Sequence, residues 1–273
     1  MKNAMVLLAF SLVFLAGVDG RAEVASLTLD LGNGPHAFTA PELLARGEVA
    51  DITIDNDADY HRRTQYRAVP LLSLLPNVVH DRFDTLEMRA TDGFVAQIPL
   101  TLVDRARTGG AVPWIAIEEP GRPWPNLPGK EVSAAPFYLV WQHPERSGII
   151  SEQWPYKLAS ITATASPSKR WPQLAIRQSA ASDPIVQRGQ RAFFTSCLPC
   201  HRLSGGGAGD VGPDLGQPMN ATEYLSEPGL RAVIRDSRSV RTWPLQQMPA
   251  FSPESLPDAD IDAIIAYIRS QRG

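Results

Sequence analysis

The chain contains two cysteines, and both lie in the five-residue stretch Cys197-Leu198-Pro199-Cys200-His201. Two thiols at this spacing can add to the two vinyl groups of one porphyrin, and the histidine that follows then faces the iron. A thioredoxin-like redox pair needs a surrounding βαβ pattern, and a zinc site needs a further pair of Cys or His ligands at short spacing. The sequence shows neither pattern. We therefore predict one covalent haem c, attached through Cys197 and Cys200, with His201 on the iron.

Residues on both sides of this stretch extend the pattern. Pro213 follows His201 by twelve positions within Gly212-Pro213-Asp214-Leu215, and Gly189 and Phe193 precede Cys197. The arrangement resembles the class I cytochromes c, which are all-α domains. The resemblance implies that the Pro213 carbonyl accepts from the ring N–H of His201, which would orient the imidazole and make it more basic. It also implies that Gly189 and Phe193 lie where the first helix crosses the last, against Tyr267.

The sixth iron ligand is expected in the stretch Met248-Pro249-Ala250-Phe251, which looks like the distal-ligand loop of that family. Met219 is the rival ligand, and either methionine can instead be a core residue that fills a gap. A thioether ligand raises the potential of the iron. Arg241 and Trp243 are candidate donors to a haem propionate. The nearby Arg231, Arg235 and Arg238 are either a solvated helix face or a surface that steers an acidic partner.

Residues 1–22 have the layout of a secretory signal peptide, with Lys2, an apolar run from Ala4 to Val18 and small residues at a plausible cleavage site. The apolar run is short for a membrane span, so we expect no stable span after cleavage, and an uncleaved anchor is the alternative. Haem attachment to such a motif is completed outside the inner membrane in the family. The expected location is the periplasm.

Residues 23–165 are predicted to form an α+β domain rich in strands. Strands are expected over residues 25–31, 49–54, 86–90, 95–99, 137–141 and 158–164, with a turn at Asp92-Gly93. Thr39-Ala40-Pro41-Glu42 is a capping-box start for a short helix that reaches about Arg46. Five prolines predict a long irregular loop over residues 113–128, and such a loop in a compact domain is functional or mobile.

Several phrases of this domain resemble the sulfite oxidase-type molybdopterin-binding fold. They are Tyr66-Arg67-Ala68-Val69-Pro70-Leu71-Leu72, Ala90-Thr91-Asp92-Gly93-Phe94, Pro136-Phe137-Tyr138-Leu139-Val140 and Trp154-Pro155-Tyr156-Lys157-Leu158. In that family a cysteine thiolate ligates molybdenum, and this domain contains no cysteine. A soft, charged ligand cannot be dropped without changing what the site holds. We therefore expect no molybdenum, and a fold that serves docking, an interface or a small ligand.

Three further sets of residues in this domain have a functional and an ordinary interpretation. Four histidines are scattered singly and are expected at the surface or in the core rather than on a metal: His36, His61, His80 and His143. The aromatic cluster of Trp114, Trp124, Trp141, His143 and Trp154 lines either a pocket or a β-rich core. The basic cluster of Arg62, Arg63 and Arg67 either contacts a pterin phosphate or docks an acidic partner.

Residues 166–182 are small, polar and Pro-bearing, and they predict a linker. Residues 183–273 then form the helical domain, with Asp183 as N-cap and Pro184 at the first helical position. A short helix is expected over residues 228–235. A final helix starts near Pro257 and carries an apolar stripe of Ile261, Ile264, Ile265 and Ile268.

The net charge of −3 gives no reason to expect nucleic acid as a partner. Two functions remain in play. In the first, the protein is an electron-transfer cytochrome that exchanges single electrons with a periplasmic redox partner docked through the N-terminal domain. In the second, it is an enzyme or enzyme subunit whose N-terminal domain binds a substrate or cofactor and passes electrons to the haem. A methionine on the iron favours the first, because it leaves no open position for chemistry.

Overall fold

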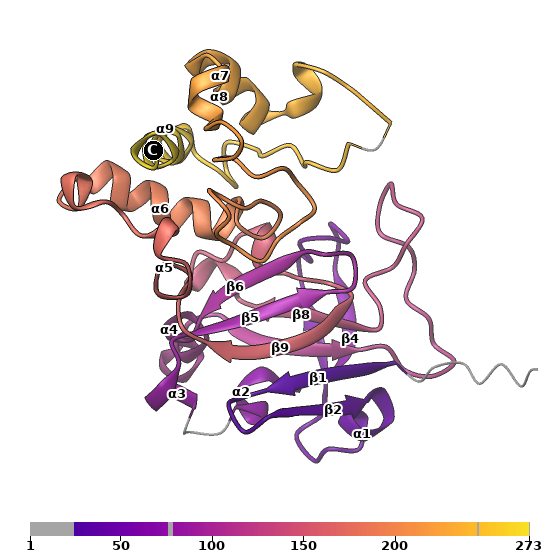
Figure 1. Cartoon of the computed structure of the whole chain (residues 1–273). Helices are drawn as coiled ribbons and strands as arrows, with labels where there is room; N and C mark the ends of the chain where they lie inside the picture. Colours follow the sequence, from indigo (N-terminus) through magenta and orange to yellow (C-terminus); the bar gives the residue numbers. More distant parts are fainter. Residues whose placement is uncertain (1–24, 76–78, 245, 273) are drawn as a thin grey trace, which may run out of the picture.

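The computed structural model describes residues 25–75, 79–244 and 246–272. It contains a β-rich N-terminal domain and a helical C-terminal domain that lies against one end of it (Figure 1). The proposed signal peptide at residues 1–22 lies outside the described residues. Among those that are described, no helix is both long enough and apolar enough to cross a membrane.

Five strands form the first sheet, in the order β2-β1-β9-β5-β6. The β1–β9 pair is parallel, and every other pair of neighbours is antiparallel. Alternate side chains of β1 are buried, as expected for a strand with one face on the core. The strands are β1 (Ser26–Asp30), β2 (Pro35–Thr39), β5 (Thr85–Ala90), β6 (Val95–Pro99) and β9 (Leu158–Thr164).

Four antiparallel strands form the second sheet, in the order β3-β4-β7-β8. The first five residues of β8 are all buried, so this strand packs on both faces. One hydrophobic core includes side chains from both sheets, among them the fully buried Trp141 and Met88. The strands are β3 (Ala50–Ile54), β4 (Thr64–Pro70), β7 (Val112–Ile117) and β8 (Phe137–Gln142).

Short helices connect these strands. Helix α1 (Ala40–Leu44) begins at Thr39, whose hydroxyl accepts from the Glu42 N–H while the Glu42 carboxylate accepts from the Thr39 N–H. This is the capping box predicted from the sequence. The other helices of the domain are α2 (Leu71–Leu74), α3 (Val79–Arg82) and α4 (Leu100–Asp104).

Strands β2, β4 and β7 were not predicted, and β7 corrects the expected irregular loop over residues 113–128. Strand β7 was not expected because it contains Pro113, and a proline has no backbone N–H to donate to a neighbouring strand. In the structure Pro113 pairs with Trp141 of β8, whereas the pairing of β7 with β4 ends at Trp114. Pro113 therefore has no β4 neighbour to which it would have to donate. Between Ile117 and Phe137 the chain forms no further strand longer than a single bridge.

Two long helices cross in the C-terminal domain, α6 (Pro184–Ser196) and α9 (Asp258–Ser270). At the crossing a Cβ on Gly189 would lie 1.9 Å from the carbonyl oxygen of Ala263, so only glycine permits this approach. The rings of Phe193 and Tyr267 pack beside it with centroids 5.4 Å apart. The isoleucine stripe of α9 is buried. The shorter helices are α7 (Ala221–Tyr224) and α8 (Glu227–Arg235).

Residues 166–182, expected as a linker, pack against both domains. Helix α5 (Pro167–Arg170) places Arg170 2.5 Å from the Glu87 carboxylate of β5, and Lys169 2.6 Å from Asp84. Leu174 is fully buried in the core of the helical domain, and its carbonyl accepts from the Tyr267 hydroxyl. The segment differs from an open tether because Pro167 and Leu174 are buried and its two cations pair with carboxylates of the β-rich domain.

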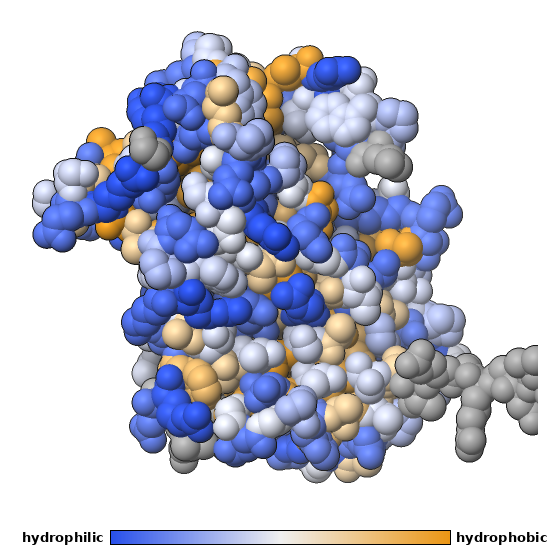
Figure 2. Space-filling view, viewed as in Figure 1, coloured by the Kyte–Doolittle hydropathy of each residue, from blue (hydrophilic) through white to orange (hydrophobic). Residues whose placement is uncertain are grey.

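The domains also meet directly. The Val95 N–H of β6 donates to the Pro199 carbonyl over 2.9 Å, and Pro199 is buried. Gly93, in the β5–β6 turn, lies so close to Asp210 that a Cβ would be 2.7 Å from its carboxylate. Figure 2 shows mainly hydrophilic residues over both domains on the face drawn, with hydrophobic residues in small separate groups. The β5–β6 hairpin is therefore packed against the loop that carries the two cysteines.

Candidate functional site

The C-x-x-C-H stretch begins directly after the last residue of helix α6. The helix is capped by Asp183, whose carboxylate accepts from the N–H groups of Ile185 and Val186, and it ends at Ser196. Cys197 is the C-cap, and its carbonyl accepts from the N–H of Cys200 and from that of His201 over 3.1 and 2.9 Å. One tight turn thus carries both thiols and the imidazole.

The two thiols are held in their neutral form. Burial raises the pKa of Cys197 and raises that of Cys200 to about 12, and the nearby Glu152 carboxylate adds to both shifts. Both are free cysteines. A dithiol redox pair works through a thiolate whose pKa is lowered, and these surroundings shift the thiol pKa values in the opposite direction.

The imidazole of His201 is oriented by Pro213. His201 Nδ1 lies 2.8 Å from the Pro213 carbonyl oxygen, which can only accept, so Nδ1 carries the hydrogen and Nε2 keeps a free lone pair. Burial lowers the pKa of His201, and the Pro213 carbonyl and the Asp214 carboxylate oppose the shift. A neutral imidazole with a free Nε2 is the form that binds a metal ion.

Gly212 and Asp214 hold the Pro213 loop in place, and the sequence analysis assigned them no role. A Cβ on Gly212 would lie 2.4 Å from the His201 ring, so glycine lets the loop approach the imidazole. The Asp214 carboxylate accepts from the N–H groups of Ser204, Gly205 and Gly216 over 2.7–2.9 Å. An aspartate two residues before a glycine, in a loop rich in glycine, is the signal that could have identified it.

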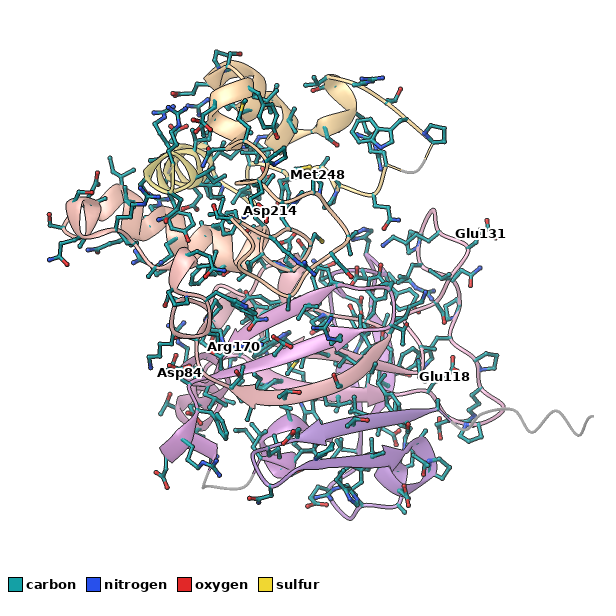
Figure 3. The ribbon with its side chains drawn as sticks, viewed as in Figure 1. Asp84, Glu118, Glu131, Arg170, Asp214 and Met248 are labelled. Carbon is teal, nitrogen blue, oxygen red and sulfur yellow. The ribbon has the colours of Figure 1, made fainter. Side chains whose placement is uncertain are left out.

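The two candidate methionines differ in burial. Met248 is half-buried and packs against the core of the helical domain, whereas Met219 is 52 % exposed. Three residues past Met248, the buried Phe251 donates its N–H to the Arg235 carbonyl over 3.0 Å and anchors the segment. Figure 3 shows Met248 and Asp214 together in the loops of the helical domain. This placement favours Met248 as the iron ligand.

The arginine run ahead of Met248 divides into two parts. Arg231 pairs with Glu227 and Asp262, and Arg235 pairs with Asp258, so these two stabilise the packing of α8 on α9. Arg241 and Trp243 lie on the exposed segment after α8. Neither the indole N–H of Trp243 nor the guanidinium of Arg241 makes a hydrogen bond or ion pair within the described residues. Both donors are free to bind an anionic group.

The predicted features of the N-terminal domain do not form one site. Trp141 and Trp154 belong to the core, Trp124 lines a cavity in the β-rich domain, and His143 is exposed. The expected basic patch is also divided, because Arg63 pairs with Asp55 and Arg67 pairs with Asp51. No group of three or more His, Cys, Asp or Glu side chains that could hold a metal ion occurs in the described part of the chain.

The residues of the C-x-x-C-H region fit a covalent haem. Two neutral thiols lie in one turn, and the imidazole keeps a free nitrogen. Gly212 lets the Pro213 loop pack directly against the His201 ring. Residues 186–272 match the family model described as Cytochrome c. A comparison with curated proteins finds no match to the chain. The C-terminal part of the molecule is therefore a cytochrome c domain, a haem c-binding domain that transfers electrons, and it is joined to a β-rich domain.

Proposed function

We propose that the protein is a periplasmic electron carrier with one covalent haem c and His/Met ligation. The observation that carries this proposal is the 2.8 Å contact between His201 Nδ1 and the Pro213 carbonyl, one turn after Cys197 and Cys200. A carbonyl partner on Nδ1 fixes the ring and raises the basicity of Nε2. Bound haem supplies a one-electron couple, and the chain's residues hold it and set its potential.

Each candidate residue has a distinct part in this proposal. Cys197 and Cys200 would attach the haem, His201 and Met248 would be the two protein ligands of the iron, and Pro213 orients His201. Arg241 and Trp243 donate to a propionate, since both donors are exposed and have no partner among the residues that the structure describes. A methionine thioether raises the potential and fills the sixth position. The filled position suits a carrier better than an enzyme that needs an open iron site.

The N-terminal domain is proposed to dock the partner oxidoreductase. The sequence phrases that resemble the sulfite oxidase-type fold fall on strand β4, on strand β8 and at the β5–β6 hairpin. No cysteine between Glu23 and Pro167 offers a thiolate to molybdenum. The Val95–Pro199 hydrogen bond places its β5–β6 hairpin beside the haem-attachment loop. A partner that binds at this hairpin would therefore sit close to the haem. Cross-links to the partner should map to residues 25–165, and cross-links confined to residues 184–272 would overturn this role.

The carrier assignment is tested by carbon monoxide on the reduced full-length protein. With Met248 on the iron, the visible spectrum should stay unchanged at neutral pH, and a Met248→Ala variant should bind the gas. Iron should be near one per chain, and molybdenum at background. Stoichiometric carbon monoxide binding by the wild type would indicate an open site and an enzyme, and stoichiometric molybdenum would refute the cofactor-free N-terminal domain.

A further inference from the structure

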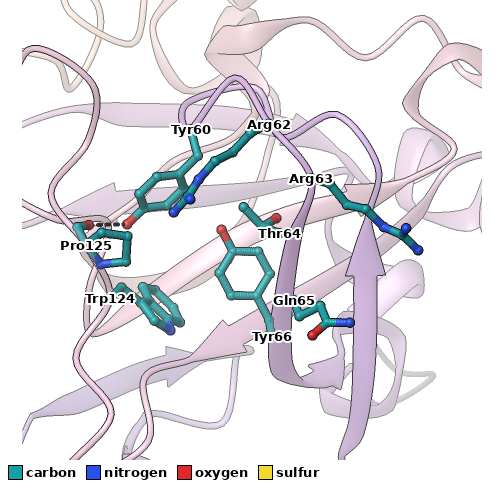
Figure 4. A pocket seen from close by; sticks show the side chains of 8 residues that line it. All are labelled: Tyr60, Arg62, Arg63, Thr64, Gln65, Tyr66, Trp124 and Pro125. Carbon is teal, nitrogen blue, oxygen red and sulfur yellow. Dashed lines mark hydrogen bonds between the residues drawn. The ribbon is translucent and has the colours of Figure 1, made fainter.

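An aromatic-walled cavity of about 410 Å³ opens between β4 and the long loop after β7. Its walls are the rings of Tyr60, Tyr66 and Trp124, and Arg62 lies at its rim (Figure 4). The two tyrosines are almost fully buried, and the Tyr66 and Trp124 rings meet edge to face with centroids 5.1 Å apart. The size lies within the range of small-molecule sites.

Asp57 builds the loop that presents these residues. It is fully buried, and its carboxylate accepts from the N–H groups of Asp59 and Tyr60. Three hydroxyl groups also donate to it, those of Thr64, Tyr66 and Tyr138. The Asp57 N–H in turn donates to the Arg62 carbonyl over 3.0 Å. A carboxylate with five donors is saturated, so Asp57 fixes the loop and takes no ligand.

The wall tyrosines offer a ligand no free hydroxyl donor, and they are only 4 % and 5 % exposed. The Tyr60 hydroxyl donates to the Pro125 carbonyl over 2.9 Å and accepts from the Ala134 N–H. The Tyr66 hydroxyl donates to Asp57 over 2.8 Å. Since both hydroxyl hydrogens are already used, the contacts open to a ligand include the exposed part of the Trp124 ring and the Arg62 charge at the rim.

Arg62 supplies that charge. Its guanidinium lies 5.9 Å from the centroid of the Tyr60 ring, and no carboxylate within the described residues pairs with it. The next residue, Arg63, pairs with Asp55 and points away from the aromatic walls (Figure 4). The two neighbouring arginines thus differ both in pairing and in position. Only Arg62 combines a free guanidinium with a position beside the aromatic rings.

We propose that this cavity binds a small planar organic anion, an aromatic ring that carries a carboxylate. The ring would stack against the half-buried Trp124, and the carboxylate would accept two parallel hydrogen bonds from Arg62. The site offers no thiolate and no metal cluster, so its ligand is held by these contacts alone. This inference extends the proposed function by giving the N-terminal domain a ligand, and it does not depend on the haem assignment.

Calorimetric titration of the haem-loaded full-length protein tests the ligand class with three probes of similar size. Benzoate has the ring and the charge, benzamide lacks the charge, and cyclohexanecarboxylate lacks the planar ring. Benzoate should bind, and each of the other two should bind at least about tenfold more weakly. Absence of benzoate binding at millimolar concentration, or equal affinity for benzoate and benzamide, would overturn the proposal.

The matched variants are Arg62→Gln and Arg63→Gln. R62Q should lose about tenfold or more of the benzoate affinity, and R63Q should keep it within about twofold. Trp124→Phe should retain most of the affinity and Trp124→Ala should lose it. Equal affinities of R62Q and R63Q would contradict the assignment. An unchanged far-ultraviolet circular dichroism spectrum and an unchanged unfolding midpoint of R62Q show that its β-rich domain is folded. Because the readout is binding itself, failure here leaves the electron-carrier proposal standing.

Discussion

The backbone N–H of Val95 donates to the carbonyl oxygen of Pro199 over 2.9 Å, and this bond joins the first residue of β6 to the middle of the C-x-x-C-H stretch. Pro199 is buried by the contact. Glu152, from the same N-terminal domain, is close enough to raise the pKa of both thiols. The β-rich domain is therefore part of the surroundings of the haem-attachment loop.

The ion pair between Arg170 and Glu87 should contribute more to stability than its neighbour. Glu87 is 11 % exposed and Arg170 28 %, so removing the arginine leaves a carboxylate that is poorly solvated. Arg170→Gln should lower the free energy of unfolding by about 1–3 kcal/mol in urea titrations, because Arg89 and Gln97 still contact the Glu87 carboxylate. Lys169→Gln is the control, since the 68 % exposed Lys169 pairs with Asp84 at the surface and should cost less than about 1 kcal/mol. Equal losses would contradict this difference.

The crossing of α6 and α9 should not tolerate a side chain at position 189. Gly189→Ala puts a methyl group 1.9 Å from the Ala263 carbonyl oxygen and must separate the helices, at a cost of about 2–4 kcal/mol in thermal or urea unfolding. Gly229→Ala is the matched control in α8, where the added Cβ meets only the Ser226 hydroxyl, 3.1 Å away. It should be neutral or stabilising by up to about 1 kcal/mol. Similar losses in both variants would disprove the close crossing.

Asp59 should make stability fall as the pH rises. Burial raises its pKa from 3.8 to about 7, although the hydrogen bond from Tyr138 opposes the shift. Because the folded chain holds this proton more tightly than the unfolded chain, the contribution of Asp59 to stability is fully present below about pH 4 and is lost as the pH rises to about 7, by at most about 4 kcal/mol.

The variant Asp59→Asn removes this titration. Its free energy of unfolding, relative to the wild type, should therefore rise between pH 5 and pH 8. The Tyr138 hydroxyl supports the same assignment, because it lies 3.0 Å from both Asp57 and Asp59 and has one hydrogen to donate. Both contacts are hydrogen bonds at the same time when Asp59 is protonated and donates to the Tyr138 oxygen while Tyr138 donates to Asp57. A difference between variant and wild type that stays constant from pH 5 to pH 8 would show that Asp59 is ionised throughout.

The two methionines should respond differently to truncation. Met248→Ala should remove the weak near-infrared band of a methionine–iron bond and lower the reduction potential, because a thioether favours the reduced iron. Met219→Ala should leave both unchanged, since that side chain is 52 % exposed. Near-infrared spectra and spectroelectrochemical titrations measure the two effects. Loss of the band in Met219→Ala alone would reverse the ligand assignment.

The sequence predicted elements that have a local signal. The alternation around Leu27 and Leu29, the capping box at Thr39 and Glu42, and the Asp-Gly turn at Gly93 all mark elements that the structure contains. Strands β2, β4 and β7 lacked such a signal. The proline in β7 is accommodated only because of where β4 ends, which is a property of the sheet and cannot be read from the strand's own residues.

In the site, too, the residues predicted from the sequence are those marked by a local pattern, and the residues that were missed come from distant segments. The C-x-x-C-H stretch identified residues that share one turn, and spacing pointed to Pro213. Glu152 approaches the thiols from another domain, and Asp57 collects donors from three segments of the chain. No local pattern marks either carboxylate, because each acquires its partners only when the chain folds. The cavity beside Arg62 escaped prediction for the same reason.

The mass of the purified, denatured full-length protein tests the central claim most directly. The account predicts that each chain carries the mass of one haem in addition to its own, and that the haem stays with the chain in acid acetone. The double variant Cys197→Ala and Cys200→Ala should show the mass of the chain alone. A wild-type chain without added mass, or haem that extracts freely from it, would contradict the assignment of a covalent haem to Cys197 and Cys200.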